Sequence, residues 1–299
     1  MKAFEFISPL QAGIPTKLGL FSDIHFDSPD CDKETFKAHL DYCLKDQRYV
    51  LVGGDFFDAI LLKDQKRAVN HIVEGRDNQL NVKLEEAAHF LDPYKNIIIF
   101  FGRGNHEESV MKYNGLDLLQ MLTSLLNAGN KKNQIQYGNY SNFLRFEWIK
   151  PKHTGIAAHY DIYQHHGAGA NSPVTKGMID FNRLLHGVDA DLVWCGHKHN
   201  SLVLGADPLM QVSKNGDVIL KNRQAIMTPS YQKSATVDYN INFAERFYTH
   251  QSLPGFGEVT ITPQYEDKKV ILQKDIKLNV NPSLFVGKTV SQKLKLRQR

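Results

Sequence analysis

Residues 97–107 read IIIFFGRGNHE. The apolar run that ends at Gly102 is rich in β-branched and aromatic residues, which is typical of a buried strand in a parallel sheet. The amide, imidazole and carboxylate of Asn105, His106 and Glu107 therefore follow the carboxyl end of a strand. Because ligands bind at this edge of open α/β sheets, the stretch predicts a fold class and also the place where chemistry is expected.

Two earlier segments end in the same way. Residues 17–21 form a short apolar strand followed by SDIH at 22–25, and residues 49–52 form another followed by GGDFFD at 53–58. Helical apolar spacing follows the first of these strands, and Asp32 is the expected N-cap of that helix. Strands that alternate with helices indicate βαβ units and a largely parallel sheet.

The second half of the chain is richer in strands. Further helices are expected over 61–91, 115–126 and about 172–186, and strands over 143–149, 155–160, 191–195, 201–204, 218–220 and 223–227, with a hairpin within 257–272. No repeat or low-complexity linker interrupts this pattern. One domain is therefore expected over 1–286, with a motif-bearing core at about 17–200 and a β-rich completion at 201–286.

The composition excludes several classes of protein. The 299 residues are 42% hydrophobic and 23% charged, as is ordinary for a globular protein. No apolar run approaches the ~18 residues of a membrane span, and the first residues lack the apolar segment of a secretory signal, so a cytoplasmic location without membrane association is expected. The three cysteines form no CxxC pair, which argues against a disulfide framework.

The formal charge of +4 is concentrated at one end of the chain. Residues 287–299 contain five basic residues and no acid, so the rest of the chain would carry −1. A mild excess of this kind is weak support for nucleic-acid binding. A flexible, solvated tail is the simpler interpretation.

Five groups of metal-ligand residues lie at or between the strand ends. They are Asp23 with His25, Asp55 with Asp58, Asn105 with His106, His165 with His166, and His197 with His199. Side chains at i and i+2 of a strand share a face, so D-x-H and H-x-H can each direct two donors one way. Mixed imidazole and carboxylate ligands suit Zn, Fe or Mn, and a carboxylate shared by two ions ~3.5–4 Å apart is the arrangement of two-metal hydrolases.

These motifs resemble the signature of the calcineurin-like metallophosphoesterase superfamily: D-x-H, G-D-x-x-D, G-N-H-[ED], a later H, and G-H-x-H. The matching segments occur in that order at Asp23–His25, Gly54–Asp58, Gly104–Glu107, His166–Gly167 and Gly196–His199. The resemblance implies a four-layer α/β/β/α sandwich of two mixed sheets flanked by helices. It also implies two divalent metal ions, with Mn favoured and Zn, Fe or Ni compatible with the same ligands.

The resemblance further implies a role for each motif residue. Asp55 would bridge the two ions, and the other ligands would be Asp23, His25 and His199 for the first ion and Asn105, His166 and His197 for the second. His106 would stabilise the phosphate or protonate the leaving oxygen, oriented by Asp58. His165 stays an alternative to His166, which is favoured because it precedes a glycine. His159 is expected to be a strand residue or to lie outside the ligand set.

The implied reaction is hydrolysis of a phosphate ester by a metal-bridging hydroxide. Gly167–Ala170 resembles the glycine-rich loop of some prophage-type and nuclease-like members, which favours a phosphodiester in a nucleic acid or nucleotide. A phosphomonoesterase acting on a small molecule or phosphoprotein is the alternative, and a non-catalytic scaffold is less favoured. Arg103 and Tyr231 are the candidate substrate contacts. Tyr231 belongs to an aromatic and basic stretch, 228–256, that could equally be the packed cover of the second sheet.

Overall fold

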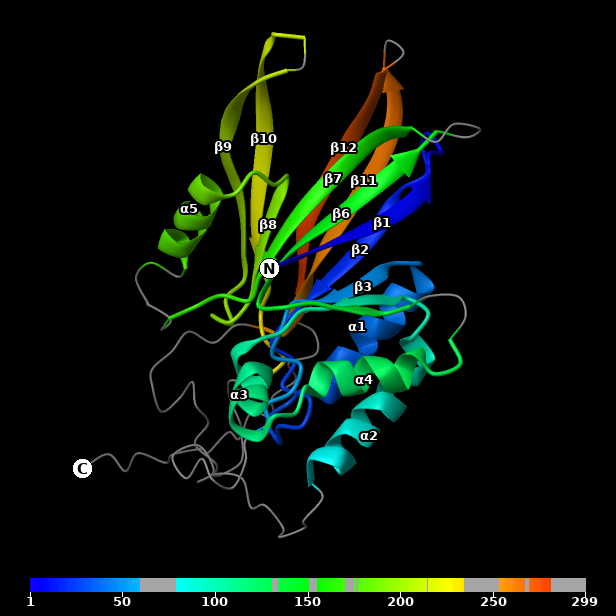
Figure 1. Cartoon of the computed structure of the whole chain (residues 1–299), viewed down its shortest axis with the longest axis vertical. Helices are drawn as coiled ribbons and strands as arrows, with labels where there is room; N and C mark the ends of the chain where they lie inside the picture. Colours follow the sequence, from blue (N-terminus) through cyan, green and yellow to red (C-terminus); the bar gives the residue numbers. More distant parts are fainter. Residues whose placement is uncertain are drawn as a thin grey trace, which may run out of the picture.

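Two six-stranded sheets pack face to face, with helices against their outer surfaces (Figure 1). The structure is a computed structural model that describes residues 1–59, 79–130, 134–150, 155–169, 175, 177–213, 215–233, 253–266 and 269–280. The predicted four-layer α/β/β/α arrangement is confirmed. The predicted basic tail at 287–299 and the first part of the helix expected over 61–91 lie outside the described residues.

The sheet that carries the first three motifs has the order β12-β11-β2-β3-β4-β5. Its parallel strands are β2 (Thr16–Phe21), β3 (Tyr49–Val52), β4 (Ile98–Phe101) and β5 (Gln136–Tyr137). The hairpin of β11 (Gly255–Glu266) and β12 (Lys269–Val280) joins antiparallel to β2. Because β2, β3 and β4 are parallel neighbours, the three motif loops that follow them meet at one edge of the sheet.

The second sheet has the order β1-β6-β7-β8-β10-β9. Its strands are β1 (Lys2–Pro9), β6 (Ser141–Ile149), β7 (Ile156–His165), β8 (Leu192–Cys195), β9 (Leu202–Val212) and β10 (Val218–Met227). The sequence did not predict β1, which pairs parallel with β6. It divided β10 into two strands, whereas the ladder to β9 continues through a register shift between Lys221 and Arg223.

Four of the α-helices follow the strands of the first sheet. They are α1 (Lys33–Lys45), α2 (Gln79–Leu91, followed by a 3-10 turn, η2, at Asp92–Tyr94), α3 (Asn105–Asn114) and α4 (Leu118–Asn127), whereas α5 (Met178–Gly187) packs on β8 of the second sheet. The predicted cap is present, since Asp32 Oδ1 accepts the Thr35 N–H at 3.1 Å. Among the residues that the structure describes, no helix is long and apolar enough to cross a membrane.

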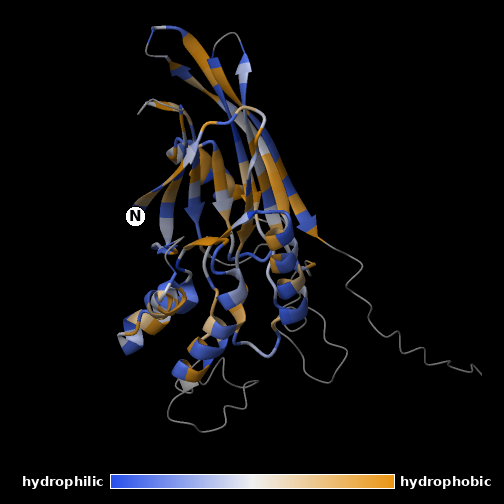
Figure 2. Ribbon diagram, turned by 90° about the vertical axis from the view of Figure 1, so that its right-hand side faces the viewer, coloured by the Kyte–Doolittle hydropathy of each residue, from blue (hydrophilic) through white to orange (hydrophobic). Residues whose placement is uncertain are grey.

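Apolar side chains form three layers, one beneath the helices of the first sheet, one between the sheets and one beneath α5. Trp148, Tyr160 and Trp194 fill the layer between the sheets, and each is at most 2% exposed. Hydrophobic stretches alternate with polar ones along the facing strands (Figure 2). Full burial of a large apolar side chain contributes ~1.5–3 kcal/mol, so this layer fixes the sheets, and with them the loops at their edge.

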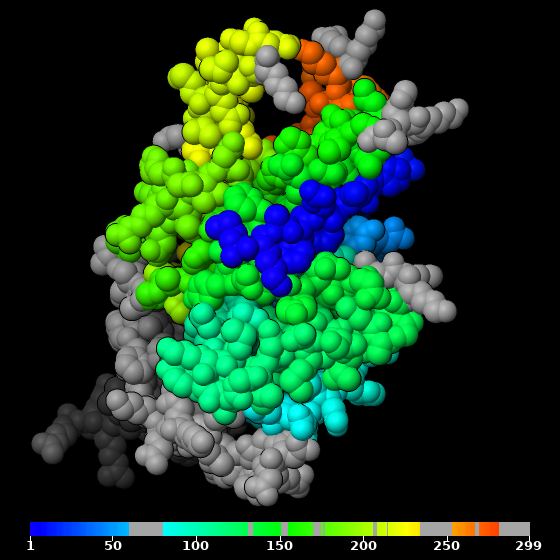
Figure 3. All heavy atoms as spheres, viewed as in Figure 1, coloured from blue at the N-terminus to red at the C-terminus, as the bar shows by residue number. Residues whose placement is uncertain are grey.

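The second sheet divides at the end far from the motif loops. β8 begins at Leu192, which pairs with Ile162 of β7 and with Gln224 of β10. β7 already starts at Ile156 and β10 at Val218, so β8 does not lie between them over these first residues. The far end of the β9–β10 hairpin is therefore separated from β7 (Figure 1), and its Met210 and Val212 side chains are exposed. Figure 3 shows this end of the hairpin at the top of the molecule. The motif loops lie at the opposite, well-packed end of these strands.

The prediction that Tyr231 contacts substrate is wrong. Its side chain is fully buried, its ring stacks 6.1 Å from that of Phe21, and its hydroxyl lies 2.7 Å from His39 Nδ1. Phe256 is equally buried and stacks on Phe21 at 4.7 Å. These two aromatics are therefore packed in the core, but beneath α1 on the first sheet and not over the second sheet, as the alternative had it. Residues 234–252 of the same stretch lie outside the described residues.

The buried His39 predicts a measurable pH dependence of stability. Burial lowers the pKa of His39 to about 4, below the ordinary ~6.5 that it regains on unfolding. The neutral ring is therefore favoured in the folded chain, and its contribution is complete above pH ~6.5 and lost as the pH falls towards 4. Between pH 7 and pH 5 we expect His39 to account for a loss of about 2 kcal/mol.

Urea unfolding at the two pH values, compared with His39→Gln, measures this contribution. Glutamine keeps a hydrogen-bonding group for Tyr231 but does not titrate, so the difference between pH 7 and pH 5 should shrink by about 2 kcal/mol in the variant. An unchanged difference would mean that His39 does not set the acid sensitivity of the fold.

Candidate metal centre

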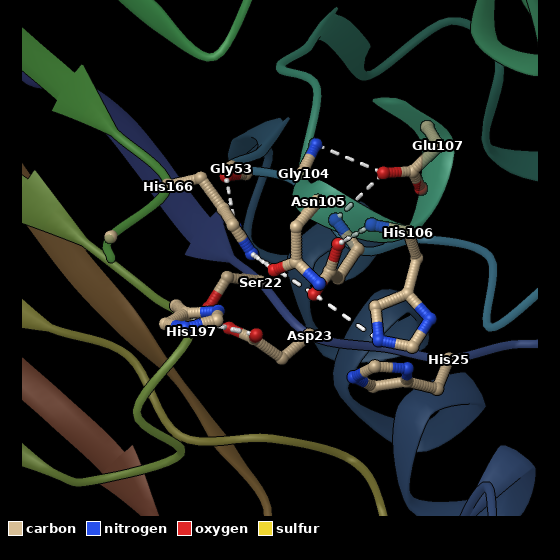
Figure 4. Close-up of polar contacts among 12 residues, drawn as sticks. Ser22, Asp23, His25, Gly53, Gly104, Asn105, His106, Glu107, His166 and His197 are labelled. Carbon is tan, nitrogen blue, oxygen red and sulfur yellow. Dashed lines mark hydrogen bonds and ion pairs between the residues drawn. The ribbon is translucent and has the colours of Figure 1, made fainter. Parts of the chain in front are cut away.

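The loops after β2 and β3 run side by side, and the loops of the second sheet meet them. The N–H groups of Asp23 and His25 donate to the carbonyls of Gly54 and Asp55, both at 3.0 Å. From the second sheet, the His197 N–H donates to the Asp23 carboxylate at 2.9 Å. Figure 4 shows Asp23, His25, Asn105, His106, His166 and His197 converging from these separate segments.

The backbone of five candidate ligands is left-handed. They are Asp23 (φ 53°), His25 (49°), Asp55 (49°), His197 (66°) and His199 (53°). Across the described part of the chain, only Gln47 and Ala59 share this conformation among residues other than glycine. Such conformations cost ~1–3 kcal/mol each and cluster at functional sites, where the surrounding structure holds them.

Asp23, His25 and His199 form a first group, in which the ligand atoms all lie within 4.8 Å of one another. His199 Nε2 is 3.4 Å from Asp23 Oδ1. The Nδ1 atom of His25 is engaged with Asp58 Oδ1 at 3.0 Å, whereas its buried Nε2 has no hydrogen-bond partner among the described residues. An imidazole fixed through one nitrogen, with the other buried and free, is the arrangement that a metal ion needs.

Asp55, His166 and His197 form a second group with the same spacing. His166 is fully buried, and its Nε2 lies 3.0 Å from Asp55 Oδ2 and 3.1 Å from Asn105 Oδ1. Its Nδ1 faces the Gly53 carbonyl at 3.3 Å, and His197 Nε2 faces the Gly169 carbonyl at 3.1 Å. These carbonyls fix the ring orientations and leave one nitrogen of each ring for the centre.

The neighbouring histidines lie outside this group. His165 is the last residue of β7, and its Nδ1 accepts the Gly167 N–H at 3.0 Å, which fixes the ring at the end of that strand. His159 is half exposed on β7, with its Nε2 3.8 Å from Asp161. Of the two alternatives that the sequence left open, the structure therefore brings His166, and not His165, to the candidate ligands.

His106 and Asp58 lie beside both groups. The Asp58 carboxylate lies 3.3 Å from His106 Nδ1 and also contacts His25, so these three residues form a further cluster of possible ligands. His106 Nδ1 also lies 2.6 Å from the Asp58 carbonyl, while its Nε2 is 4.0 Å from Asp55 Oδ2. Asp58 thus holds one nitrogen of His106 and leaves the other facing the centre.

A family model for calcineurin-like phosphoesterases matches residues 16–201, which include every one of these segments. The chain belongs to this family. Metal-dependent hydrolysis of phosphate esters is the activity that membership implies. No curated protein matches the sequence.

Two solved structures resemble this phosphoesterase weakly. One is Vacuolar Protein Sorting 29 from Cryptosporidium parvum, with 13% identity and a TM-score of 0.36, covering 89% of this chain and 99% of the other. The other is GAP50, the anchor in the inner membrane complex of Plasmodium, with 13% identity and a TM-score of 0.42, covering 89% of each chain.

The charges in the phosphoesterase centre compensate one another. Burial would raise the pKa of Asp55, but the positive charge of His166, supported by His106 and His25, lowers it well below its usual range. Burial likewise opposes protonation of His166, yet Asp55 raises the pKa of that ring to about 9. A cation at this position would replace the imidazolium proton, since a metal ion needs neutral imidazole and ionised carboxylate.

Three glycines of the motifs are needed for steric reasons. A Cβ atom on Gly104 would lie 2.0 Å from Asp55 Oδ1, and one on Gly196 would lie 2.5 Å from Asp23 Oδ2. One on Gly54 would lie 2.6 Å from His166 Nδ1. Each glycine therefore leaves space for a ligand from a different motif. The carboxylates, imidazoles and amide that meet there form a donor set suited to two divalent cations.

The sequence placed Glu107 in a motif but gave it no role. Its carboxylate is 1% exposed and accepts the N–H groups of Gly104, Phe57 and Asp55 at 2.9, 2.9 and 3.2 Å. Burial, followed by the charge of Asp55, raises the pKa of Glu107 to about 7. Glu107 therefore joins the start of α3 to the Asp55 loop. A Glu at the third position of a helix is the signal that could have revealed this.

The prediction that Arg103 contacts substrate is not supported. Its guanidinium forms an ion pair with Asp117, and both side chains are largely buried. Asp117 is also the N-cap of α4, where its Oδ1 accepts the Gln120 N–H at 3.1 Å. Arg103 thus fixes the start of α4, and its charge is already paired with Asp117.

Proposed function

We propose that the chain is a binuclear-metal-dependent phosphoesterase whose preferred substrate is a phosphodiester in a nucleic acid or nucleotide. The observation that carries the proposal is the pair of ligand groups, Asp23–His25–His199 and Asp55–His166–His197, each with its ligand atoms within 4.8 Å. Asp55 is the bridging residue in this proposal, and Asn105 completes the second group. Manganese is the favoured metal.

When bound, two cations lower the pKa of a water molecule towards neutrality and offset the negative charge of the phosphoryl oxygens. The residues of the chain orient these partners. His166 and His197 are held by backbone carbonyls, and Asp23 is held by the His197 N–H. His106 has the role of giving a proton to the leaving oxygen through Nε2, because Nδ1 is occupied by Asp58.

Two features support a diester over a monoester. A monoester dianion calls for positive charge beyond the two metals, and Arg103, the cation beside the central motif, is paired with Asp117. The loop at Gly167–Gly169 carries almost no side chain and reaches His197 through the Gly169 carbonyl, so its own side chains would not obstruct a second ester substituent. Phosphomonoester hydrolysis is the alternative, since the ligand groups themselves favour neither substrate.

Reconstitution of metal-stripped protein tests the proposal. Hydrolysis of bis-p-nitrophenyl phosphate and of p-nitrophenyl phosphate is measured with Mn, with Zn and without added metal. We expect turnover to require metal and to favour the diester by about 10-fold or more, a discrimination of ~1.4 kcal/mol. Preference for the monoester would overturn the substrate class, and no turnover of either ester with two metals bound would favour the non-catalytic scaffold.

A further inference from the structure

Asp27 lies two residues beyond His25 and outside every motif, yet it is one of the best-connected carboxylates near the centre. Its side chain is 2% exposed. One carboxylate oxygen accepts the Asp58 N–H at 2.5 Å and the other accepts the Ala59 N–H at 3.0 Å. Lys83, on α2, donates to the same carboxylate at 3.1 Å and to the Asp27 carbonyl at 3.3 Å.

The two N–H groups held by Asp27 belong to the segment that orients His106. The Ala59 N–H and the Asp58 carbonyl are the two ends of one peptide group. Asp27 binds the N–H end, while His106 Nδ1 lies 2.6 Å from the carbonyl end. Because a peptide group is planar, fixing its N–H also fixes the direction of its carbonyl oxygen.

The Asp58–Ala59 segment needs stabilisation by another part of the chain. Ala59 has a left-handed backbone, with φ 47°, and alanine has no side-chain group that could stabilise that conformation. A charged acceptor on two successive N–H groups is a strong local restraint, because hydrogen bonds to an ionised group are roughly twice as strong as neutral ones. The Asp58 side chain lies on the same restrained residue and also contacts His25 and His106.

We propose that Asp27, held by Lys83, is the positioning residue for His106: it sets the Asp58–Ala59 peptide so that His106 Nδ1 is fixed and Nε2 faces the leaving oxygen. The inference rests on the proposed function, in which His106 protonates that oxygen. Lys83 is 31% exposed, so its contribution is screened by solvent and smaller than that of Asp27.

The leaving group separates positioning from general loss of structure. A p-nitrophenolate departs without much help, whereas a phenolate or alkoxide needs a proton in the transition state. Misplacing His106 must therefore slow phenyl esters more than p-nitrophenyl esters. A defect that merely destabilises the fold would lower both rates by the same factor.

The experiment compares Asp27→Ala, Asp27→Asn and Lys83→Met with the wild type on p-nitrophenyl and phenyl diesters, in metal-reconstituted protein with bound metal measured. For Asp27→Ala we expect kcat on the phenyl ester to fall by about 10–100-fold, as for other residues that orient a reacting group, and on the p-nitrophenyl ester by about threefold or less. Asp27→Asn, which keeps one acceptor and the shape, should lie between, with Lys83→Met closest to the wild type.

Asp46→Ala is the matched control. Asp46 is likewise a carboxylate that pairs with basic side chains, Lys17 at 2.6 Å and Arg48 at 2.8 Å, but it lies at the C-terminal end of α1, beside the start of β2 and far from the centre. Its loss should lower both rates equally or not at all. If Asp27→Ala behaves like Asp46→Ala, the proposal is wrong. It is also wrong if excess metal restores the rate, since Asp27 would then act through the ligand His25.

A double-mutant cycle distinguishes the two proposals. In His106→Ala, adding Asp27→Ala should cause no further loss on the phenyl ester, because the group that Asp27 positions is gone. If His106→Ala itself shows no leaving-group dependence, the proposed role of His106 fails. If His106→Ala shows that dependence and Asp27→Ala does not, only the positioning role of Asp27 fails.

Discussion

Replacing Asp55 with asparagine is expected to abolish metal-dependent hydrolysis, with kcat/KM lower by about 10⁴-fold or more. A bound cation brings the pKa of water from ~15.7 to ~7, and this activation of water is lost when the cation no longer binds. The carboxylate lies 3.0 Å from His166 Nε2 and accepts the His106 N–H at 3.0 Å. As the proposed bridging residue, it would contribute to both metal sites. The amide has the same shape but cannot supply charge to two cations.

The measurement is bound metal per chain together with turnover. We expect metal occupancy to fall at both sites in Asp55→Asn, because the two groups share this residue. Asp161→Asn is a suitable control, since Asp161 is a largely buried carboxylate that pairs with Arg145 at 2.8 Å on β7, away from the centre. Retention of two tightly bound metals in Asp55→Asn would show that Asp55 does not bridge.

His106→Ala is expected to lower turnover by about 10²–10⁴-fold, the usual contribution of a general acid or base, while both metals stay bound. The His106 ring belongs to neither proposed ligand set, and its Nδ1 is held by the Asp58 carbonyl at 2.6 Å. Burial lowers the pKa of His106, but the charges of Asp55 and Asp58 outweigh it and raise the pKa above its ordinary value. Asp58, which belongs to neither proposed ligand set, thus favours the protonated ring that a general acid requires.

Metal analysis and kinetics on the two leaving groups test this expectation. His159→Ala, which removes a half-exposed histidine from β7, should leave both properties unchanged. Loss of both metals from His106→Ala would contradict the assignment and make His106 a ligand.

Much of the centre could be predicted from the sequence because its signals are local and ordered. Three apolar runs, each followed within a few residues by Asp23, Asp55 or Asn105, identified parallel strands. Side chains that follow such strands must meet at one edge of the sheet. The structure brings these residues together with His25, His166, His197 and His199. The choice between His165 and His166 depended on the turn after β7, which has no periodic signal.

The remaining features depend on contacts between distant residues. Tyr231 and Arg103 carry groups that could bind a nucleotide, and the sequence cannot show that His39 and Asp117 already occupy them. α3 was missed because the Asn105 motif was interpreted as a loop, although Glu107 gives a capping signal. β1 has alternating Phe4 and Phe6, but it depends on β6, more than a hundred residues later, for its pairing.

The left-handed backbone of five candidate ligands places the stability of the fold in conflict with activity. These residues are Asp23, His25, Asp55, His197 and His199. Glycine would relieve the strain at any of these positions and remove the side chain for which the strain is maintained. Under selection for thermal tolerance alone, we expect variants of the metal-free protein to lose these residues early. Engineering of a more thermostable variant should therefore begin with substitutions elsewhere in the fold and select for activity at every round.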